Sequence, residues 1–246
     1  MPLILATTTE SDGSSGEPEI FASLQGEGPS AGRPSVFVRL SNCNLACGWC
    51  DTAYTWRFAG PGAFERKANQ VVLSEDDTAA RILALGGASR IGRLVVTGGE
   101  PLLQSPALAK LLALLPAMHI EIETNGTVAP PPAFDALVQQ YNVSPKLAHS
   151  GNPAHRALIP DRLAAFAADP RAFFKFVVAN PGDIAEVLSL VATYAIPRER
   201  LFLMPEGTDS ATLRTRARWL AEVCADEGLR LSDRLHIHLY GDTRGT

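Results

Sequence analysis

The sequence has no long apolar run and no surplus of positive charge. Its 246 residues carry 22 Lys and Arg against 26 Asp and Glu, a formal net charge of −4. Proteins that bind the phosphate backbone of nucleic acids concentrate basic residues, so this balance argues against such a function. No apolar segment is long enough to cross a bilayer, and the first residues lack the basic start of a secretion signal. We therefore expect a cytoplasmic protein that does not bind membranes.

Cysteine is also scarce, with four residues in the whole chain. Four thiols with three of them clustered make a poor disulfide framework for a protein of this size, which favours metal binding by the cluster. The fourth, Cys224, lies on the apolar side of a predicted helix, where we interpret it as a small buried hydrophobe. The same helix carries the most basic stretch, interpreted as a solvated face, which consists of Arg214, Arg216 and Arg218.

Short β-branched runs alternate with helical patterns from Pro34 onward. The predicted strands cover residues 35–40, 93–97, 119–123, 141–143, 173–178, 201–204 and 235–239, and the predicted helices cover 74–85, 105–115, 132–140, 161–168, 183–194 and 210–227. Because this alternation needs crossover connections, we predict an α/β fold with mostly parallel strands, an incomplete TIM-type β/α barrel. Residues 1–18 are predicted to be a flexible polar tail, and residues 19–246 a single domain.

Polar motifs follow five of the predicted strands. They are SNCNLACGWCDT after the first strand, TGGEP at the second, ETNGT at the third, SPK at the fourth and MPEG at the sixth. Chemistry in parallel α/β sheets gathers just beyond the C-terminal ends of the strands. We therefore expect these five segments to form one site.

The cysteine motif has the spacing CxxxCxxC, with Cys43, Cys47 and Cys50 on a predicted loop. A structural zinc ion or a simple electron-carrying iron–sulfur cluster takes four protein ligands. Three thiolates on a cubane would leave one iron open to an outside ligand. From the residues alone, a closed zinc site and a chance grouping of thiols remain alternatives.

The triplet, with the aromatic Trp49 before its last cysteine, resembles that of the radical S-adenosylmethionine superfamily. Other segments resemble the 7-carboxy-7-deazaguanine synthases within it: EIFASLQGEG (19–28), FVRL (37–40), CDT (50–52), TGGEP (97–101), ETNG (123–126), SPK (144–146) and LYGDTRG (239–245). The likeness covers the chain from about Glu19 to its last residue.

This resemblance implies a homodimeric lyase that converts 6-carboxy-5,6,7,8-tetrahydropterin to 7-carboxy-7-deazaguanine and ammonia, a step toward queuosine and related deazapurines. Its cofactors would be a [4Fe-4S] cluster, S-adenosyl-L-methionine and Mg²⁺, with electrons from a flavodoxin- or ferredoxin-type donor. Two other functions remain open, an activase that makes a glycyl radical on a partner protein and a non-catalytic zinc-binding module.

The resemblance also implies roles for single residues. Cys43, Cys47 and Cys50 would hold the cluster, and Thr52 would ligate Mg²⁺. S-adenosylmethionine would contact Gly99, Ser144, Pro145, Lys146, Met204, Pro205, Glu206 and Gly207. The pterin would contact Leu24, Gln25, Gly26, Arg39 and Thr97.

Some of these residues also carry a signal of their own. Arg39 interrupts the apolar strand VFVRL, so its guanidinium needs a partner, either the substrate carboxylate or an internal ion pair. We expect Asp51 to be a supporting carboxylate rather than a metal ligand. His236 and His238 alternate on the last predicted strand, and we expect them to form hydrogen bonds rather than bind metal. The final GDTRGT either folds over the site or forms a mobile end.

Overall fold

Seven of the eleven described strands run parallel at the centre of the structure, a computed structural model that describes residues 2–9, 15–89 and 91–246. The strands are β1 (Leu3–Thr9), β2 (Ser15–Pro18), β3 (Ile20–Leu24), β4 (Pro34–Leu40), β5 (Gln70–Leu73), β6 (Arg93–Gly98), β7 (His119–Thr124), β8 (Gln140–Val143), β9 (Ala172–Val178), β10 (Leu201–Pro205) and β11 (Arg230–Leu231). The helices are α1 (Arg66–Asn69), α2 (Glu75–Ser89), α3 (Ser105–Ala113), α4 (Pro132–Asp135), α5 (Ala154–Ala157), α6 (Pro160–Ala168), α7 (Asp183–Tyr194), α8 (Ser210–Glu227) and α9 (Leu235–Tyr240).

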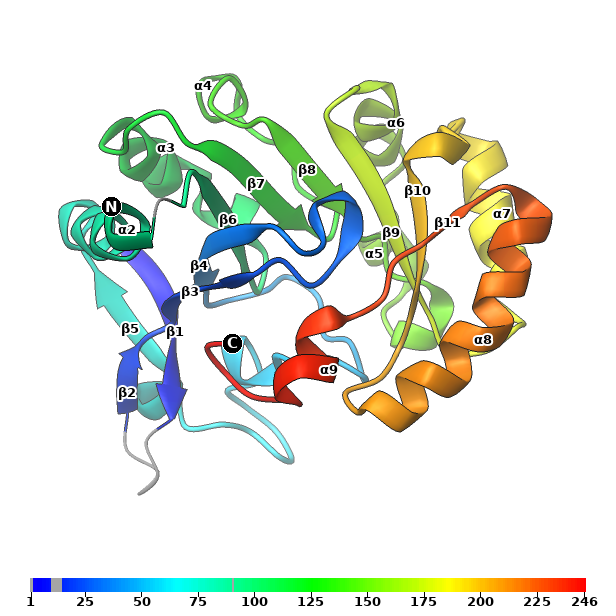
Figure 1. The fold of residues 1–246 in the computed structure, drawn as a ribbon, viewed down its shortest axis with the longest axis horizontal. Helices are drawn as coiled ribbons and strands as arrows, with labels where there is room; N and C mark the ends of the chain where they lie inside the picture. The colour runs from blue at the N-terminus through cyan, green and yellow to red at the C-terminus, as the bar shows by residue number, and fades with distance from the viewer. Residues whose placement is uncertain (1, 10–14, 90) are drawn as a thin grey trace.

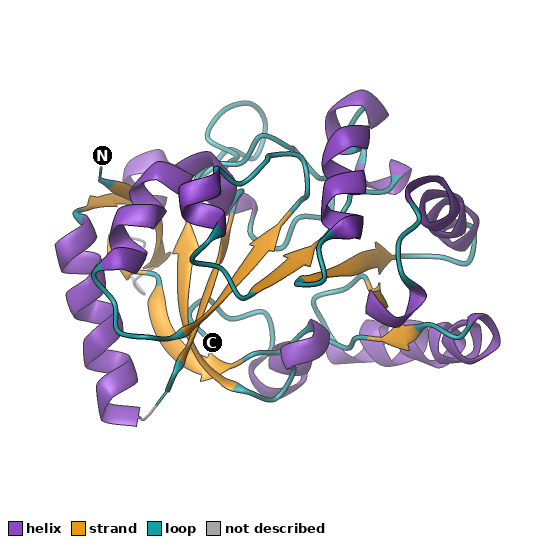
Figure 2. Cartoon of the chain, turned by 90° about the horizontal axis from the view of Figure 1, so that it is seen from above, coloured by secondary structure: helices purple, strands orange, loops and turns teal. Residues whose placement is uncertain are grey.

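The strand order β11-β10-β9-β8-β7-β6-β4 is parallel throughout, with helices around the outside of the sheet (Figure 1). On its other side β4 pairs antiparallel with β3 and β1 instead of returning to β11. Seen from above, the strands fan across the middle of the molecule without closing into a ring (Figure 2). The predicted incomplete β/α barrel is confirmed.

Side chains along the parallel strands alternate between an apolar outer face and a polar inner face. In β7, Ile120 and Ile122 belong to the main apolar core, while Glu121 and Glu123 take the other face. In β9, core residues Phe174 and Phe176 flank Lys175 in the same way. Successive residues of a strand point to opposite faces, so every second residue is available to the interior of the barrel. The charges that interrupt apolar strands therefore all belong to one surface.

The predicted tail over residues 1–18 is wrong for the segments that the structure describes. Residues 3–9 form β1, which pairs antiparallel with β5 from Leu3 opposite Leu73 to Ala6 opposite Gln70, and residues 15–18 form β2. Leu3 and Leu5 are fully buried in the main core. Two alternating leucines suffice for this short strand, because β2, β4 and β5 pair with it and the core lies beneath it. Residues 1 and 10–14 lie outside the described residues.

The last predicted strand is also wrong, because residues 235–240 form α9. His236 and His238 consequently do not share one face, and His238 bonds to Ser210 Oγ at 3.0 Å and to Asp233 Oδ2 at 3.1 Å. An alternating run of five residues fits a strand, but here tertiary contacts decide: the Leu235 amide donates to the Gly26 carbonyl, and Ile237 is buried. The helix predicted over 132–140 is wrong in its second half: α4 ends at Asp135, and Gln140 begins β8.

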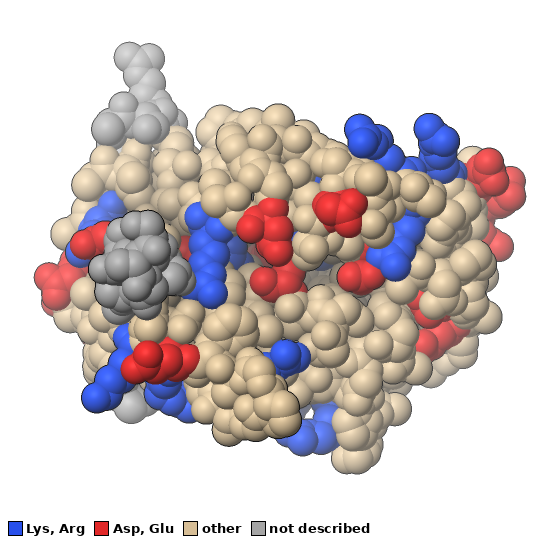
Figure 3. Space-filling model, turned by 90° about the horizontal axis from the view of Figure 1, so that it is seen from below, with Lys and Arg blue, Asp and Glu red and all other residues tan. Residues whose placement is uncertain are grey.

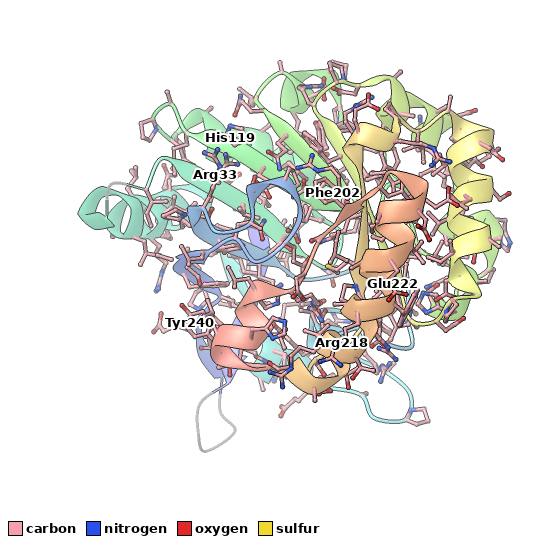
Figure 4. All side chains as sticks on the ribbon, turned by 45° about the vertical axis from the view of Figure 1, so that its right-hand side comes forward. Arg33, His119, Phe202, Arg218, Glu222 and Tyr240 are labelled. Carbon is pink, nitrogen blue, oxygen red and sulfur yellow. The ribbon has the colours of Figure 1, made fainter. Side chains whose placement is uncertain are left out.

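The surface agrees with the charge balance. Acidic and basic side chains are interspersed over the face in Figure 3, without a continuous basic stripe among its described residues. Arg218 and Glu222 project from α8 (Figure 4), and Arg214 is likewise exposed. Arg216, however, is partly buried and pairs with the Glu206 carboxylate. No helix in the described part of the chain is long and apolar enough to span a membrane.

The burial of β1 predicts the effect of a single truncation. Leu5→Ala should lower the free energy of unfolding by about 2–5 kcal/mol, because it removes buried methyl groups and leaves a cavity. Leu114→Ala, at a position 45% exposed, should change it by less than about 0.5 kcal/mol. Anaerobic urea unfolding followed by far-UV circular dichroism measures both, and equal values for the two variants would contradict the placement of β1 in the core.

Candidate active site

A cavity of about 230 Å³ opens at the C-terminal ends of the parallel strands. The loops after β4, β6, β7, β8 and β10 all contribute to its wall, as expected from their motifs. Every predicted site residue except Pro145 lines it. Cys224 packs in the main core from α8, so it does not join the three clustered cysteines. The cavity is also lined by six titratable residues for which the sequence predicted no binding role: Glu27, Asp51, Glu123, Lys175, Arg234 and His236.

The cysteine loop is held against the end of β6 by close backbone contact. The Gly99 amide donates to the Leu40 carbonyl at 3.0 Å, and the Glu100 amide donates to the Asn42 carbonyl at 2.9 Å. A Cβ on Gly99 would lie 1.9 Å from the Asn42 oxygen, and one on Gly98 would lie 2.1 Å from the Leu40 oxygen. Gly98 also has φ +120°, a region that only glycine enters readily. The two glycines thus serve to bring these loops together.

The three thiols are free and converge on the cavity. Burial raises the pKa of Cys43 to about 11 and also raises the pKa of Cys47. Among the residues that the structure describes, no three His, Cys, Asp or Glu side chains are placed to hold one metal ion. A tetrahedral zinc needs its ligands packed around a single point, whereas a cubane carries its thiolates on different iron atoms. The arrangement therefore fits an iron–sulfur cluster with three protein ligands better than a closed zinc site.

The segments after β8 and β10 form the next part of the wall. Lys146 Nζ donates to Ser144 Oγ at 2.9 Å and lies 5.5 Å from the centre of the Trp49 ring. That ring stacks on His149 at 5.5 Å, and its buried Nε1 has no hydrogen-bond partner among the described residues. A cationic Lys, an aromatic face and an unused N–H donor in one wall suit a ligand with a carboxylate and a flat ring.

Glu100 does not face the cavity, although it lies in the TGGEP motif. Its carboxylate accepts from the Leu102 amide at 3.0 Å, the Asn125 amide at 2.7 Å and Thr124 Oγ1 at 2.9 Å. Burial raises its pKa, and these three donors oppose the shift. The side chain thereby ties the loop after β6 to the loop after β7.

Arg39 forms an internal ion pair and also lines the cavity, so its position agrees with both partners expected for it, a buried carboxylate and a substrate carboxylate. Its Nε donates to Glu19 Oε1 at 2.7 Å, and Tyr54 donates its hydroxyl to the other oxygen of the same carboxylate at 2.8 Å. Glu19 is fully buried, so this internal ion pair is real. The pair uses Nε alone, and Arg39 still lines the cavity. The guanidinium is thus fixed from behind, and within the described part of the chain no hydrogen bond uses its two terminal nitrogens.

The inner face of the sheet forms a polar wall around Gln25. The Gln25 amide donates to Glu121 Oε1 at 2.6 Å and to Glu123 Oε1 at 3.1 Å. Thr97 Oγ1 donates to Glu123 Oε2 at 3.0 Å. Burial, with the neighbouring Glu123, raises the pKa of Glu121, whose other oxygen pairs with Arg93. The HIEIE pattern of β7 carried a signal for both glutamates, because alternation places them on the face opposite the isoleucines.

Glu27 is the centre of a network of buried charges. Lys175 and Arg234 both pair with its carboxylate, the latter through Nε at 3.1 Å, and His236 Nε2 lies 3.9 Å away. Burial raises the pKa of Glu27, but the two cations outweigh it and hold this pKa well below its usual range. The carboxylate is therefore ionised, as a buried acid between two cations must be.

Arg234 extends this network to two other loops. Its Nη1 donates to the Gly207 carbonyl, and its Nη2 pairs with Asp51. Asp51 thus takes part in an ion pair that joins its loop to the one with Arg234. Thr52 lines the cavity, with its hydroxyl 3.6 Å from Cys50 Sγ.

The C-terminal segment folds over the site. Asp242, Thr243, Arg244 and Thr246 line the cavity. The Arg244 guanidinium lies 3.5 Å from the centre of the Tyr54 ring, and the Gly245 amide donates to Glu19 Oε1 at 3.3 Å. The end of the chain lies beside α9 in the middle of Figure 1.

Comparison with known proteins agrees with this geometry. Residues 38–162 match the Radical SAM superfamily. The 7-carboxy-7-deazaguanine synthase of Pyrobaculum aerophilum is 42% identical over 230 residues, 92% of this chain and 95% of the relative. The enzyme of the same name from Halobacterium salinarum is 37% identical over 252 residues, covering 93% and 91% of the two chains.

A solved structure agrees with the sequence relatives. The crystal structure of QueE from Escherichia coli aligns with a TM-score of 0.64 at 26% identity, over 96% of this chain and 95% of that one. Streptococcus suis SuiB, at 15% identity and a TM-score of 0.54, shares the fold. The chain belongs to the 7-carboxy-7-deazaguanine synthase family of the Radical SAM superfamily.

Proposed function

We propose that the chain converts 6-carboxy-5,6,7,8-tetrahydropterin to 7-carboxy-7-deazaguanine and ammonia. One observation carries the proposal: three free thiols line a cavity in which no fourth cysteine of the described chain takes part. With a [4Fe-4S] cluster and S-adenosylmethionine bound there, the pair supplies the radical that starts ring contraction. Loss of ammonia accounts for the difference between substrate and product, so the reaction needs no net oxidant.

The chain's own residues bind and orient the two ligands. Lys146 and Ser144 would hold the carboxylate end of S-adenosylmethionine, beside the Gly99 backbone and the segment 204–207. Trp49 offers an aromatic face and a free N–H donor in the same wall. These groups lie at or beyond the ends of strands β4, β6, β8 and β10, so the sheet fixes their separation.

The pterin would occupy the polar side of the cavity. The terminal nitrogens of Arg39 suit its carboxylate, because guanidinium and carboxylate form two parallel charged hydrogen bonds. Gln25, Thr97 and the Glu123 carboxylate line the wall beside it and suit the N–H groups of the pterin edge. Leu24 and Gly26 complete this side as backbone and apolar contacts.

Further assignments follow from the same resemblance. Thr52 would ligate Mg²⁺, a hard cation that takes few protein oxygens and fills its sphere with water and substrate. Electrons would come from a flavodoxin- or ferredoxin-type donor. The enzyme would act as a homodimer in the cytoplasm, without nucleic acid as a partner.

The decisive experiment is anaerobic incubation of the reconstituted protein with the carboxytetrahydropterin, a reductant and S-adenosylmethionine. We expect 7-carboxy-7-deazaguanine by mass spectrometry, and about four iron and four sulfide per chain. A glycyl radical on an added partner protein, with no deazaguanine, would favour the activase. A colourless protein with stoichiometric zinc would favour the zinc module.

Two cysteine variants test the assignment of the thiols. Cys43→Ala should abolish both the cluster and turnover, because two thiolates cannot hold a cubane in place. Cys224→Ala, in the core of α8, should keep the cluster and full turnover, at a stability cost of about 1 kcal/mol. Iron analysis and product formation measure both; loss of the cluster in the second variant would show that Cys224 is a ligand.

The role of Arg39 predicts a selective loss of affinity. Arg39→Lys should weaken binding of the carboxytetrahydropterin by about 10- to 150-fold, the value of a charged hydrogen-bonded pair. Binding of a tetrahydropterin without the carboxyl group should change little. Anaerobic titration calorimetry with both pterins separates the cases. An equal loss for both ligands would mean that Arg39 acts only through its pair with Glu19.

A further inference from the structure

Each of the three clustered sulfurs accepts hydrogen bonds from N–H groups. The side-chain amide of Asn152 donates to Cys47 Sγ at 3.2 Å, and the indole of Trp56 donates to Cys50 Sγ at 3.3 Å. Cys43 Sγ receives longer contacts, from the Leu45 amide at 3.5 Å and from Asn125 Nδ2 at 3.9 Å. Two sulfurs are thus contacted closely by side chains that the sequence analysis did not single out.

The orientation of the Asn152 amide follows from its other partners. Its Oδ1 accepts from the Ala46 backbone amide at 2.9 Å. A backbone N–H can only donate, so the oxygen must face it, and the NH₂ group must face Cys47. The neighbouring backbone supports this position, because the Gly48 amide donates to the Ser150 carbonyl at 2.9 Å. The backbone carbonyl of Ser150 and the side chain of Asn152 therefore hold the cysteine loop from outside, and Asn152 directs one donor at Cys47.

The direction of the hydrogen bond from Trp56 is unambiguous, because the indole nitrogen can only donate. The residue follows the short turn of 3₁₀-helix at Ala53–Thr55, directly after the cysteine loop. The Arg57 guanidinium lies 5.1 Å from the centre of its ring. The position of the ring is thus supported on one side by its neighbour, while its N–H points to Cys50.

We propose that Asn152 and Trp56 are positioning residues that raise the reduction potential of the cluster held by Cys47 and Cys50. The proposal rests on the proposed function, which places a [4Fe-4S] cluster on these thiols. Reduction adds one electron to the cluster and makes the ligand sulfurs more negative. An N–H donor stabilises the more negative state more strongly, so it shifts the equilibrium toward reduction.

The test is a redox titration of the reconstituted cluster without S-adenosylmethionine, with dithionite as the electron source. Electron paramagnetic resonance of the reduced cluster gives the midpoint. We expect Asn152→Leu and Trp56→Phe each to disfavour reduction by about tenfold, a shift of about 59 mV toward negative potential for a one-electron couple. Asn152→Asp, which keeps the acceptor for Ala46 but loses the donor and adds charge, should shift further.

Two controls separate this effect from a general disturbance. Ser150→Ala removes a hydroxyl that also accepts from the Asn152 amide, and leaves the N–H on sulfur in place. Trp219→Phe makes the same substitution as Trp56→Phe in the distant α8. Both variants should keep the wild-type midpoint.

The possible outcomes distinguish failure of the proposed function from failure of this inference. If the wild-type protein binds no [4Fe-4S] cluster, the proposed function and this inference both fail. If the cluster is present at four iron per chain in Asn152→Leu and Trp56→Phe while their midpoints equal the wild-type value, this inference alone is overturned. If Asn152→Leu does not retain the cluster, the midpoint potential of Trp56→Phe still tests this inference.

Discussion

The alternation of side chains along the parallel strands is the constraint on which this structure depends. One face of β7 and β9 supplies isoleucine and phenylalanine to the core, and the other supplies Glu121, Glu123 and Lys175 to the inside of the barrel. Because the same backbone serves both faces, packing of the core fixes the polar groups of the cavity. A small shift of register would move every one of them, which is why binding groups on strands are more exact than those on loops.

The polar interior is stable only because its charges are matched. Glu27 with Lys175 and Arg234, and Glu19 with Arg39, remove ionised groups from water and compensate them within hydrogen-bond distance. Loss of one partner would leave the other buried and unpaired, which is far more costly than loss of an exposed pair. Because the charges are matched, the donors and acceptors of the cavity are already oriented before a ligand enters.

The sequence predicts the barrel well because strongly periodic segments alternate with apolar strands. The strands β4 and β6–β10 begin and end within two residues of their predicted bounds, and α7 and α8 match them. The prediction fails where a segment is short and tertiary contact decides, as for β1 and α9. It also misses long-range partners: Asp51 and Arg234 lie 183 residues apart, and no local pattern connects them. The cysteine triplet was recognisable because its spacing is local, whereas Asn152, 105 residues beyond Cys47, was not.

The three bonds of Arg234 have a consequence for how ligands influence one another. One rigid guanidinium joins the loop with Gln25 and Glu27, the loop with Asp51 and Thr52, and the Gly207 carbonyl. A ligand that displaces any one of these loops therefore also changes the bonds that Arg234 makes to the other two. Any effect of one ligand on the affinity of another through this side chain is reciprocal by thermodynamic necessity.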